Sequence, residues 1–414
     1  MTTERRGGTV NVVFISPHYP AEMVDFTRGL AEVGANVIAV SDQPLAAIPE
    51  GVRRHLSAYV QAPIFDEDAA VKVILAGLGK LHVDRVETLW EPCVVLAAKV
   101  RQAIGIPGMS PEVALRFRDK GLMKEAAIAG GVRVPHAFRV RTANEVWAAA
   151  EQVGFPLIIK PIAGAGTADT FRCFEKRQLE DAVQRTRHVA EASVEEYIDG
   201  DEFTYDTVCI DGRPAFENVA QYHPRPIEGR TNEWISPAQH VFRNPYIPEL
   251  AAGIDLGRRT MAALGMTTGF THMEWYRKPS GEVVLGEIAA RSGGGKLVDM
   301  MNYSNDFDVY REWARAVCWK SFEAKAERRY FVGMVFKRAL GNGRISQIEG
   351  LERVRARAGR WLVEEAMLPI GARRRDWKQT LLSDGHVTFR HPDFSEVWDM
   401  MKTAITDLRV YAAR

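Results

Sequence analysis

The sequence predicts an α/β and α+β protein, in which a parallel, Rossmann-like sheet comes first and mixed strands and helices follow. Two observations carry this prediction. Up to Pro111, apolar strand-like runs alternate with helical patterns, which is the order that builds βαβ units. Beyond Pro111, strands follow one another through hairpin turns such as Asp211-Gly212, as in an α+β arrangement.

Length and charge narrow the class of protein. The chain has 414 residues, with 54 Lys plus Arg against 53 Asp plus Glu. At about 100–200 residues per domain this length predicts several domains, and the balanced charge excludes a globally basic nucleic-acid binder. No apolar run approaches the roughly 20 residues of a membrane helix, so no membrane partner is expected. The four scattered cysteines predict neither a metal knuckle nor a disulfide framework, which favours a cytoplasmic protein.

The first predicted domain covers residues 1–111. Its first strand-to-helix turn reads Ser16-Pro17-His18-Tyr19-Pro20, with no glycine to let the backbone approach a pyrophosphate, so dinucleotide binding is not expected there. The predicted elements are strands at 10–16, 36–40 and 85–89 and helices at 23–33, 71–81 and 92–103.

The second predicted domain, residues 112–328, begins with two lysines in unlike settings. Lys120 lies on a predicted helix, where a solvated helix face explains it equally well. Lys160 ends an apolar strand, and its charge is costly to bury unless an anion meets it. The small residues that follow, Gly164, Gly166 and Thr167, can bend over a phosphate and offer backbone N–H donors. The pattern predicts a polyphosphate clamp, and an ordinary hairpin turn remains the alternative.

A strand starting near Val194 runs through a bend at Gly200 into a hairpin. Such a connection could line a cleft with the backbone groups of Glu196 and Ile198, while the carboxylate of Glu202 could accept ribose hydroxyls. A charged, exposed loop is the alternative.

The strongest signal is a pair of glutamates on one predicted hairpin. If its four-residue turn pairs Arg277 with Glu282, strand alternation places Glu274 and Glu287 on one face as diagonal neighbours, about 5–8 Å apart. Two close carboxylates repel each other, so a bound cation is the natural compensation, and oxygen ligands favour magnesium or manganese over zinc. His272 shares this face and is explained equally well as a core histidine.

Arg291 follows the second glutamate by four residues and precedes three glycines. Its planar guanidinium could stabilise a transferring phosphate or a substrate carboxylate, and the glycines could form an anion nest. The segment is no Walker motif, because Ala290 stands at the required first glycine and Leu297 follows the lysine.

The third predicted domain, residues 329–414, reads as a small α+β cap. Its predicted elements are strands at 332–338, 345–354 and 384–389 and a helix at 394–408, with a turn at 341–343.

In this order and spacing, the motifs resemble the ATP-grasp superfamily over about residues 112–320. The segment Glu287-Ile288-Ala289-Ala290-Arg291-Ser292-Gly293 is most similar to L-amino-acid ligases and related carboxylate–amine ligases. The resemblance implies an ATP-grasp fold with an N-terminal Rossmann-like pre-ATP-grasp domain and a C-terminal α+β cap. Many members carry asparagine where this chain has Ala289, which leaves the coordination of a second metal open.

The resemblance also implies a role for each motif residue. ATP would lie between two lobes, with magnesium, or manganese, bridging its phosphates. The implied roles are phosphate binding by Lys120 and Lys160, lid residues Gly164, Gly166 and Thr167, adenine contacts from Glu195, Glu196 and Ile198, a ribose contact from Glu202, metal ligation by Glu274 and Glu287, and catalysis by Arg291 with Lys160.

The implied reaction joins a small-molecule carboxylate to an amine through an acyl phosphate, with release of ADP and phosphate. A biotin-carboxylase-like enzyme that phosphorylates bicarbonate and a non-catalytic ATP-binding regulatory module are the alternatives. The polar loop around Arg225 and Trp234 could approach the acceptor pocket or be a plain solvent loop. A homodimer is expected by analogy with the superfamily alone.

Overall fold

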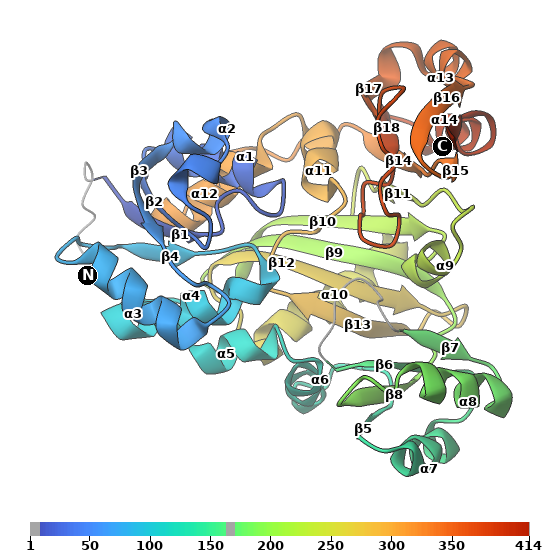
Figure 1. Ribbon diagram of the computed structural model, residues 1–414, viewed down its shortest axis with the longest axis horizontal. Coiled ribbons are helices and arrows are strands. Elements are labelled where there is room, and N and C mark those ends of the chain that lie inside the picture. The colour runs from blue at the N-terminus through green and yellow to red at the C-terminus, as the bar shows by residue number, and fades with distance from the viewer. Residues whose placement is uncertain (1–8, 163–169, 414) are drawn as a thin grey trace.

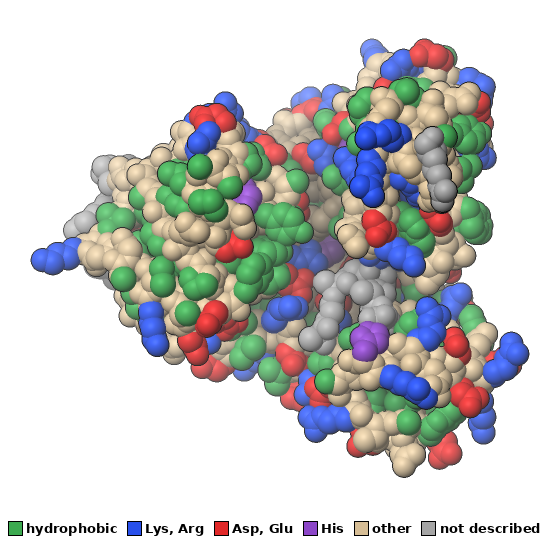
Figure 2. Space-filling view, in the orientation of Figure 1, with side chains coloured by type: hydrophobic (Ala, Val, Ile, Leu, Met, Phe, Trp, Pro, Cys, Tyr) green, Lys and Arg blue, Asp and Glu red, His purple; other side chains and the backbone are tan. Residues whose placement is uncertain are grey.

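The computed structural model describes residues 9–162 and 170–413 (Figure 1). Gly164, Gly166 and Thr167 lie outside the described residues. An N-terminal part, a small lobe and a C-terminal part surround one long central sheet, and the surface is hollowed between the N-terminal and C-terminal parts (Figure 2). No helix in the described ranges is long and apolar enough to cross a membrane.

The N-terminal part is the predicted parallel sheet, with strand order β3-β2-β1-β4. Residues 12–15 of its first strand are apolar and fully buried, as in parallel strands whose two faces are covered by helices. The sequence patterns did not predict β3. The elements are β1 (Asn11–Ile15), α1 (Met23–Glu32), β2 (Asn36–Ser41), α2 (Glu50–Arg53), β3 (Leu56–Gln61), α3 (Glu67–Leu78), β4 (Arg85–Glu87) and α4 (Val94–Ile104), with short 3₁₀ helices at Leu45–Ala47 and Glu91–Cys93.

The small lobe is an antiparallel sheet of order β5-β8-β6-β7. Two helices lead into it, and Asp119 caps the second of them by accepting the backbone N–H groups of Gly121 and Leu122. The elements are α5 (Pro111–Arg116), α6 (Lys120–Ala129), β5 (Ala137–Val140), α7 (Ala143–Val153), β6 (Leu157–Pro161), β7 (Phe171–Cys173), α8 (Lys176–Arg185) and β8 (Ala192–Glu196).

The central sheet has eight strands in the order β13-β12-β9-β10-β11-β14-β18-β17, all antiparallel. It therefore runs without a break across the predicted boundary at residue 328, and the three domain ranges stay predictions. The elements up to that boundary are β9 (Asp201–Ile210), β10 (Arg213–His223), α9 (Pro226–Thr231), β11 (Ala238–Val241), α10 (Pro248–Leu264), β12 (Gly269–Arg277), β13 (Val283–Ala289), α11 (Leu297–Asn305) and α12 (Val309–Trp319).

The C-terminal part adds a small sheet of order β15-β19-β16 beside the end of the central one. The expected strand at 345–354 was partly wrong, because the strand ends at Glu349 and a helix begins at Leu351 after Gly350, which adopts a φ of +78°. The elements are β14 (Phe331–Lys337), β15 (Leu340–Gly341), β16 (Arg344–Glu349), α13 (Leu351–Ala358), β17 (Leu362–Met367), β18 (Gly385–His391), α14 (Phe394–Asp407) and β19 (Arg409–Ala413), with a 3₁₀ helix at Gly359–Trp361.

Candidate active site

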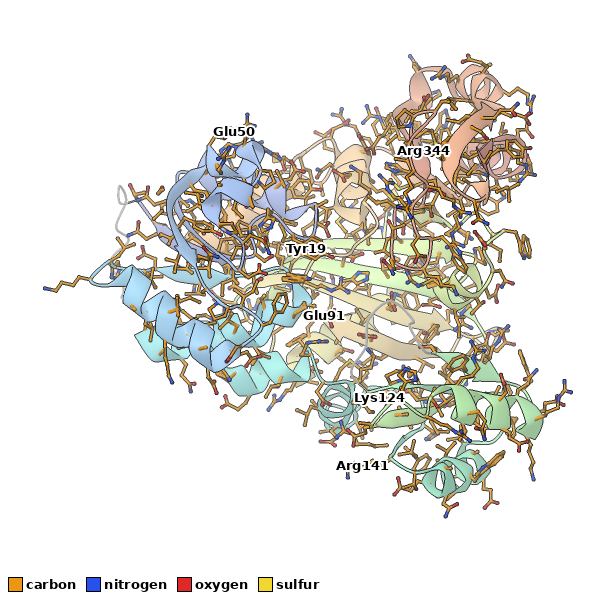
Figure 3. The ribbon with its side chains drawn as sticks, in the orientation of Figure 1. Tyr19, Glu50, Glu91, Lys124, Arg141 and Arg344 are labelled. Carbon is orange, nitrogen blue, oxygen red and sulfur yellow. The ribbon has the colours of Figure 1, made fainter. Side chains whose placement is uncertain are left out.

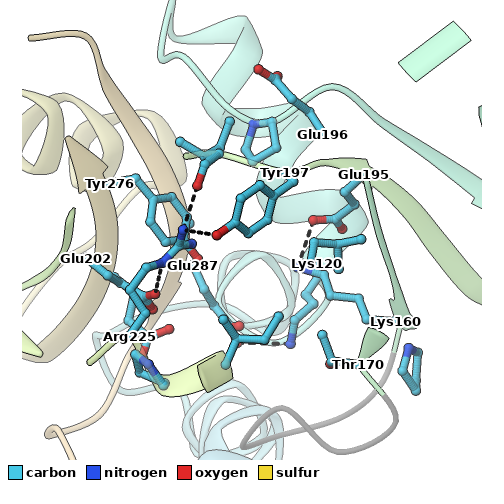
Figure 4. Close-up of a pocket in the computed structure, with 18 residues that line it drawn as sticks. Lys120, Lys160, Thr170, Glu195, Glu196, Tyr197, Glu202, Arg225, Tyr276 and Glu287 are labelled. Atoms are coloured by element: carbon cyan, nitrogen blue, oxygen red, sulfur yellow. Dashed lines mark hydrogen bonds and ion pairs between the residues drawn. The ribbon is translucent and has the colours of Figure 1, made fainter. Parts of the chain in front are cut away.

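A cavity that is partly open to solvent lies between the small lobe and the central sheet (Figure 4). It collects side chains from segments that are far apart in the sequence. The residues that line it include Lys120, Lys160, Glu195, Glu196, Tyr197, Ile198, Glu202, Arg225, Tyr276, Glu274 and Glu287.

Glu274 and Glu287 form the carboxylate pair of this cavity, and the structure corrects their register. They lie directly opposite each other across β12 and β13, whereas the sequence predicted a diagonal pair. The turn pairs Arg277 with Val283, and a bulge at Gly286 shifts the register between Glu274 and Trp275. A Cβ on Gly286 would meet the backbone oxygen of Glu274 at 3.0 Å, so the bulge suits a residue without a side chain.

Two lysines reach the same cavity (Figure 4): Lys120 from α6, the helix that leads into the small lobe, and Lys160 from β6 of that lobe. The Lys120 ammonium lies 3.1 Å from Glu287, so it lines the cavity and is not a solvated helix-face residue. Burial would raise the pKa of Glu287, but Lys120 and Lys160 outweigh that effect and hold it below its usual value. The carboxylate is therefore ionised and ready to meet a cation at neutral pH.

A third lysine joins the site through Glu195. The buried carboxylate of Glu195 contacts Lys124 at 2.6 Å and Lys160 at 2.8 Å, and so bridges α6 to β6. Burial lowers the pKa of Lys124 to about 8, against the attraction of Glu195. Burial likewise opposes the charge of Glu195, but the two lysines hold its pKa well below the usual value. Glu195 thus orients Lys160 through its side chain.

The other end of the cavity is built around Arg225. Its guanidinium contacts Glu202 at 3.1 Å and donates to the backbone oxygen of Ile198 at 2.7 Å. It also lies over the rings of Tyr197 and Tyr276, with centroid distances of 5.0 and 4.7 Å. Burial and the nearby Glu274 raise the pKa of Glu202 to about 8, although the Arg225 ion pair opposes the shift.

Glu196 sits at the rim of the same end. Arg133 donates to both of its carboxylate oxygens, at 2.9 and 2.8 Å, and the backbone N–H of His136 donates to one of them at 3.2 Å. The side chain of Glu196 therefore ties the end of β8 to the segment that connects α6 to β5. Any contact to a ligand would be left to its backbone groups.

Arg291 lies two residues beyond β13, and its position is fixed from the N-terminal part. Its Nε donates to Glu91 at 3.0 Å, and its Nη1 donates to the backbone oxygen of Ser292 at 2.7 Å. Burial would lower the pKa of Arg291, but Glu91, then Glu287 and Glu274, raise it. The guanidinium thus carries its charge close to the carboxylate pair.

His272 lies between Asp206 and Glu274 and contacts both. Its Nδ1 lies 2.6 Å from Asp206 on β9, and its Nε2 lies 3.8 Å from Glu274. Thr204 also donates to Asp206, at 2.7 Å. The buried Asp206 fixes the imidazole, and His272 thereby lies in a set position beside Glu274.

The donor set fits magnesium. In the part of the chain that the structure describes, no group of three or more His, Cys, Asp and Glu side chains could hold a metal by itself. Magnesium is commonly held by one or two carboxylates together with waters and substrate phosphates, and Glu274 and Glu287 offer such a pair. The cations Lys120 and Lys160 beside them suit a polyphosphate.

The structure adds residues that the sequence patterns did not single out. Lys124, Tyr197 and Tyr276 lie within predicted motif segments but were given no role, and Glu91 lies outside every predicted motif. Arg225 was noted in the sequence only as part of a polar loop, and that loop contains the short helix α9. Burial of a charged residue would have been the useful signal for Glu91 and Lys124, and a single sequence does not display burial.

Comparisons with known proteins agree with this geometry. A model of the ATP-grasp domain matches residues 153–299. The chain is 29% identical over 245 residues to an L-arginine-specific L-amino acid ligase of Bacillus subtilis, a match that covers 55% of this chain and 58% of that protein. The chain therefore spans less than two thirds of the length of that relative.

Two solved structures show the same fold over almost the whole chain. The crystal structure of an L-amino acid ligase from Bacillus licheniformis has a TM-score of 0.78 at 20% identity and covers 98% of this chain and 99% of that one. The biotin carboxylase domain of the 2-oxoglutarate carboxylase of Hydrogenobacter thermophilus, solved with magnesium ADP and bicarbonate, has a TM-score of 0.67 at 13% identity, with 97% and 92% covered.

Proposed function

We propose that this chain, whose residues 153–299 match a model of the ATP-grasp domain, is an ATP-dependent carboxylate–amine ligase. One observation carries the proposal. The directly opposed Glu274 and Glu287 share a cavity with Lys120 and Lys160, which gives carboxylates for a divalent cation beside ammonium groups for phosphate oxygens.

The residues divide the proposed work by position. Lys120 and Lys160 hold the phosphates, and Glu274 and Glu287 hold magnesium, which neutralises charge on the phosphates when bound. Arg291 stabilises the negative charge that develops on the substrate carboxylate and its phosphoryl oxygens. The γ-phosphoryl group of ATP passes to the substrate carboxylate as its bond to ADP breaks. An amine then displaces phosphate from this acyl phosphate, so that a C–N bond forms, the C–O bond to phosphate breaks and the amine loses a proton.

At the other end, Ile198 and Glu202 line the cavity, and Arg225 contacts both the backbone oxygen of Ile198 and the carboxylate of Glu202. A nucleoside bound here would replace Arg225 at these acceptors. We assign the adenine to the backbone groups of this stretch and the ribose to Glu202. The lid roles of Gly164, Gly166 and Thr167 and the adenine contacts of Glu195 and Glu196 remain part of the same proposal. Manganese is proposed as an alternative metal.

The substrates are proposed to be amino acids. The support is the likeness to an L-arginine-specific L-amino acid ligase, whose name describes such a reaction. The four cysteines are free and buried, which suits the cytoplasm we propose. A homodimer is retained as a prediction.

The test is product identification. Purified protein with ATP and Mg²⁺, or Mn²⁺ in its place, is offered a library of amino-acid pairs and other acid–amine mixtures, and products are identified by mass spectrometry. We expect ADP release that requires both an acid and an amine, and a product smaller than the sum of the two by one water. ADP release that requires bicarbonate would favour the carboxylase alternative. Tight ATP binding without turnover on any mixture would favour a regulatory module.

A further inference from the structure

Glu91 is a buried carboxylate that reaches the candidate active site from a different part of the fold. It begins the 3₁₀ helix Glu91–Cys93, just after β4 of the N-terminal sheet, and is 9% exposed. Figure 3 shows it near the centre of the view, where the N-terminal part meets the central sheet. Glu91 does not line the candidate cavity and belongs to no predicted motif. The proposed function therefore gives no role to this buried carboxylate.

Both carboxylate oxygens of Glu91 accept hydrogen bonds from arginines that lie later in the chain. Oε2 accepts from Nε of Arg291 at 3.0 Å, and Oε1 accepts from Nη1 of Arg118 at 2.8 Å. Arg118 immediately precedes Asp119, the residue that caps α6. Glu91 therefore links the end of β13 to the start of the helix that carries Lys120 and Lys124.

The contact with Arg291 determines which nitrogens of its guanidinium can meet a substrate. Among the residues that the structure describes, hydrogen bonds from Arg291 leave through Nε, to Glu91, and Nη1, to the oxygen of Ser292. Because the guanidinium is planar, fixing Nε and Nη1 also fixes the direction of Nη2. The N–H groups that remain for a substrate oxygen, the second on Nη1 and the two on Nη2, therefore have set directions before any substrate arrives.

We propose that Glu91 is a positioning residue that holds Arg291 in the orientation the ligase reaction needs. The inference rests on the proposed function of Arg291. Glu91 need not touch the substrate, and its effect passes through Arg291. Catalysis by pre-oriented charge is sensitive to displacements of about 1 Å, so loss of this contact lowers the rate of the chemical step more than the binding of ATP.

The variant that tests this is Glu91→Gln, which keeps the shape and one acceptor oxygen but removes the charge. We expect kcat to fall by about 10- to 100-fold, with KM for ATP changed less than about threefold. Glu91→Asp, which retains the charge on a shorter side chain, should recover part of the loss. Unchanged kcat in a folded Glu91→Gln variant would overturn the proposal.

A double-mutant cycle separates positioning from direct substrate contact. If Glu91 acts through Arg291, Glu91→Gln should have almost no further effect on kcat in an Arg291→Lys background. An equal effect in both backgrounds would overturn the proposal, because it would mean that Glu91 acts independently of Arg291.

Asp308→Asn is the matched control. Asp308 also pairs with an arginine across a boundary between segments, contacting Arg28 of α1 at 2.8 Å from the start of α12, away from the cavity. It should lower the thermal midpoint as Glu91→Gln does while leaving kcat unchanged. A similar fall of kcat in both variants would show general destabilisation and would contradict the proposal.

A measurement that needs no enzymatic turnover tests the contact between Glu91 and Arg291 separately from the proposed function. In ¹⁵N NMR, the Nε–H of Arg291 should exchange slowly with solvent in the wild type and faster in Glu91→Gln, while the Nε–H of Arg28 is unchanged. If the wild type turns over no acid–amine mixture, the proposed function fails, and the exchange measurement still tests the contact. Rapid exchange of the Arg291 Nε–H in the wild type would overturn the proposal.

Discussion

Lys160 is the residue whose charge the sequence explained best. It ends β6, lies in the cavity, and is neutralised there by Glu195 at 2.8 Å. Burial opposes its charge, but Glu195, Glu287 and Glu274 raise its pKa, so it remains a cation. A buried cation held between carboxylates and an open cavity is suited to an incoming anion.

Lys160→Met should therefore weaken phosphate binding. We expect kcat/KM for ATP to fall by about 10²- to 10³-fold, the usual cost of removing one preorganised donor. Lys99→Met is the control, because Lys99 pairs with Glu67 and Asp68 on the surface of the N-terminal part. Steady-state ADP release measures both, and a Lys160→Met variant as active as Lys99→Met would contradict the assignment.

Glu287 should control the magnesium requirement. Its carboxylate faces Glu274 across the hairpin, so Glu287→Gln removes half of the proposed donor pair. We expect the magnesium concentration for half-maximal activity to rise by about 10- to 100-fold. Glu282→Gln, on the exposed turn of the same hairpin, should leave the magnesium titration unchanged. Coincident titrations for the two variants would rule out Glu287 as a metal ligand.

The stacked histidines His223 and His240 predict a pH effect on stability. Their Nε2 and Nδ1 atoms lie 2.8 Å apart, and burial lowers the pKa of His223 to about 4 and that of His240 well below its usual value. Since the unfolded chain takes up these protons near pH 6.5 and the folded chain does not, stability is full above pH 6.5 and is lost as the pH falls toward 4.

For His223 alone this loss is at most about 3 kcal/mol, at 1.36 kcal/mol per unit of pKa. Urea unfolding at several pH values between 4 and 7 gives the free energy of unfolding, and the loss appears as the slope of that free energy against pH. His240→Gln should flatten the slope, because glutamine can keep a hydrogen bond to His223 and does not titrate. An unchanged slope in that variant would show that other groups cause the acid sensitivity.

At the scale of elements, the sequence predicted that the two strands carrying Glu274 and Glu287 pair in a hairpin, but it did not predict the register of that pairing. The apolar alternation around Glu274 and Glu287 indicated two strands and a turn. The bulge at Gly286, however, depends on how the chain packs against Tyr276, whose ring carbon would lie 3.0 Å from an added Cβ. A one-residue slip changes which residues face each other, and only the folded sheet determines it.

The contact between α10 and the central sheet depends on two glycines. A Cβ on Gly253 would come within 2.3 Å of the Trp275 ring, and one on Gly257 would come within 2.3 Å of the Tyr205 ring. Both rings are fully buried, so they have little room to move. The helix therefore approaches the sheet closely at these positions, beneath the strands that carry the carboxylate pair.

Gly253→Ala should destabilise the protein by about 1–3 kcal/mol, the typical cost of overpacking a core, despite the better helix propensity of alanine. Gly51→Ala is the matched change in α2, where the added Cβ would meet only Val24 at 3.8 Å. That variant should be neutral or up to about 1 kcal/mol more stable. Denaturant unfolding gives the free energy of unfolding of each variant. Equal values for the two variants would mean that α10 moves away from the sheet without cost to make room for the added Cβ.

At the scale of the whole molecule, the site could be predicted where its residues lie in local motifs. Lys120, Lys160, Glu274 and Glu287 each belong to a local pattern, and the structure brings all four into one cavity. The contact between Glu91 and Arg291 joins residues 200 positions apart, and no local pattern records such a pairing. The tertiary fold alone brings them together.

The N-terminal sheet shares its core with a helix from far along the chain. Phe14 of β1 and Phe26 of α1 are fully buried, and their ring centroids lie 5.9 and 5.0 Å from that of Trp313 in α12. Tyr310 of the same helix lies 4.8 Å from Phe26. The predicted first domain, residues 1–111, therefore lacks the helix that covers one of its faces.

We accordingly expect a fragment of residues 1–111 not to fold cooperatively by itself. Each exposed aromatic ring would forfeit about 1.5–3 kcal/mol of burial, which is a large part of the stability of a small domain. Thermal unfolding followed by near-ultraviolet circular dichroism should show no sharp transition for the fragment, and co-expression with residues 112–414 should restore one. A cooperative transition in the isolated fragment would instead show that its own helices suffice, and α12 would then be a docked neighbour rather than a part of its core.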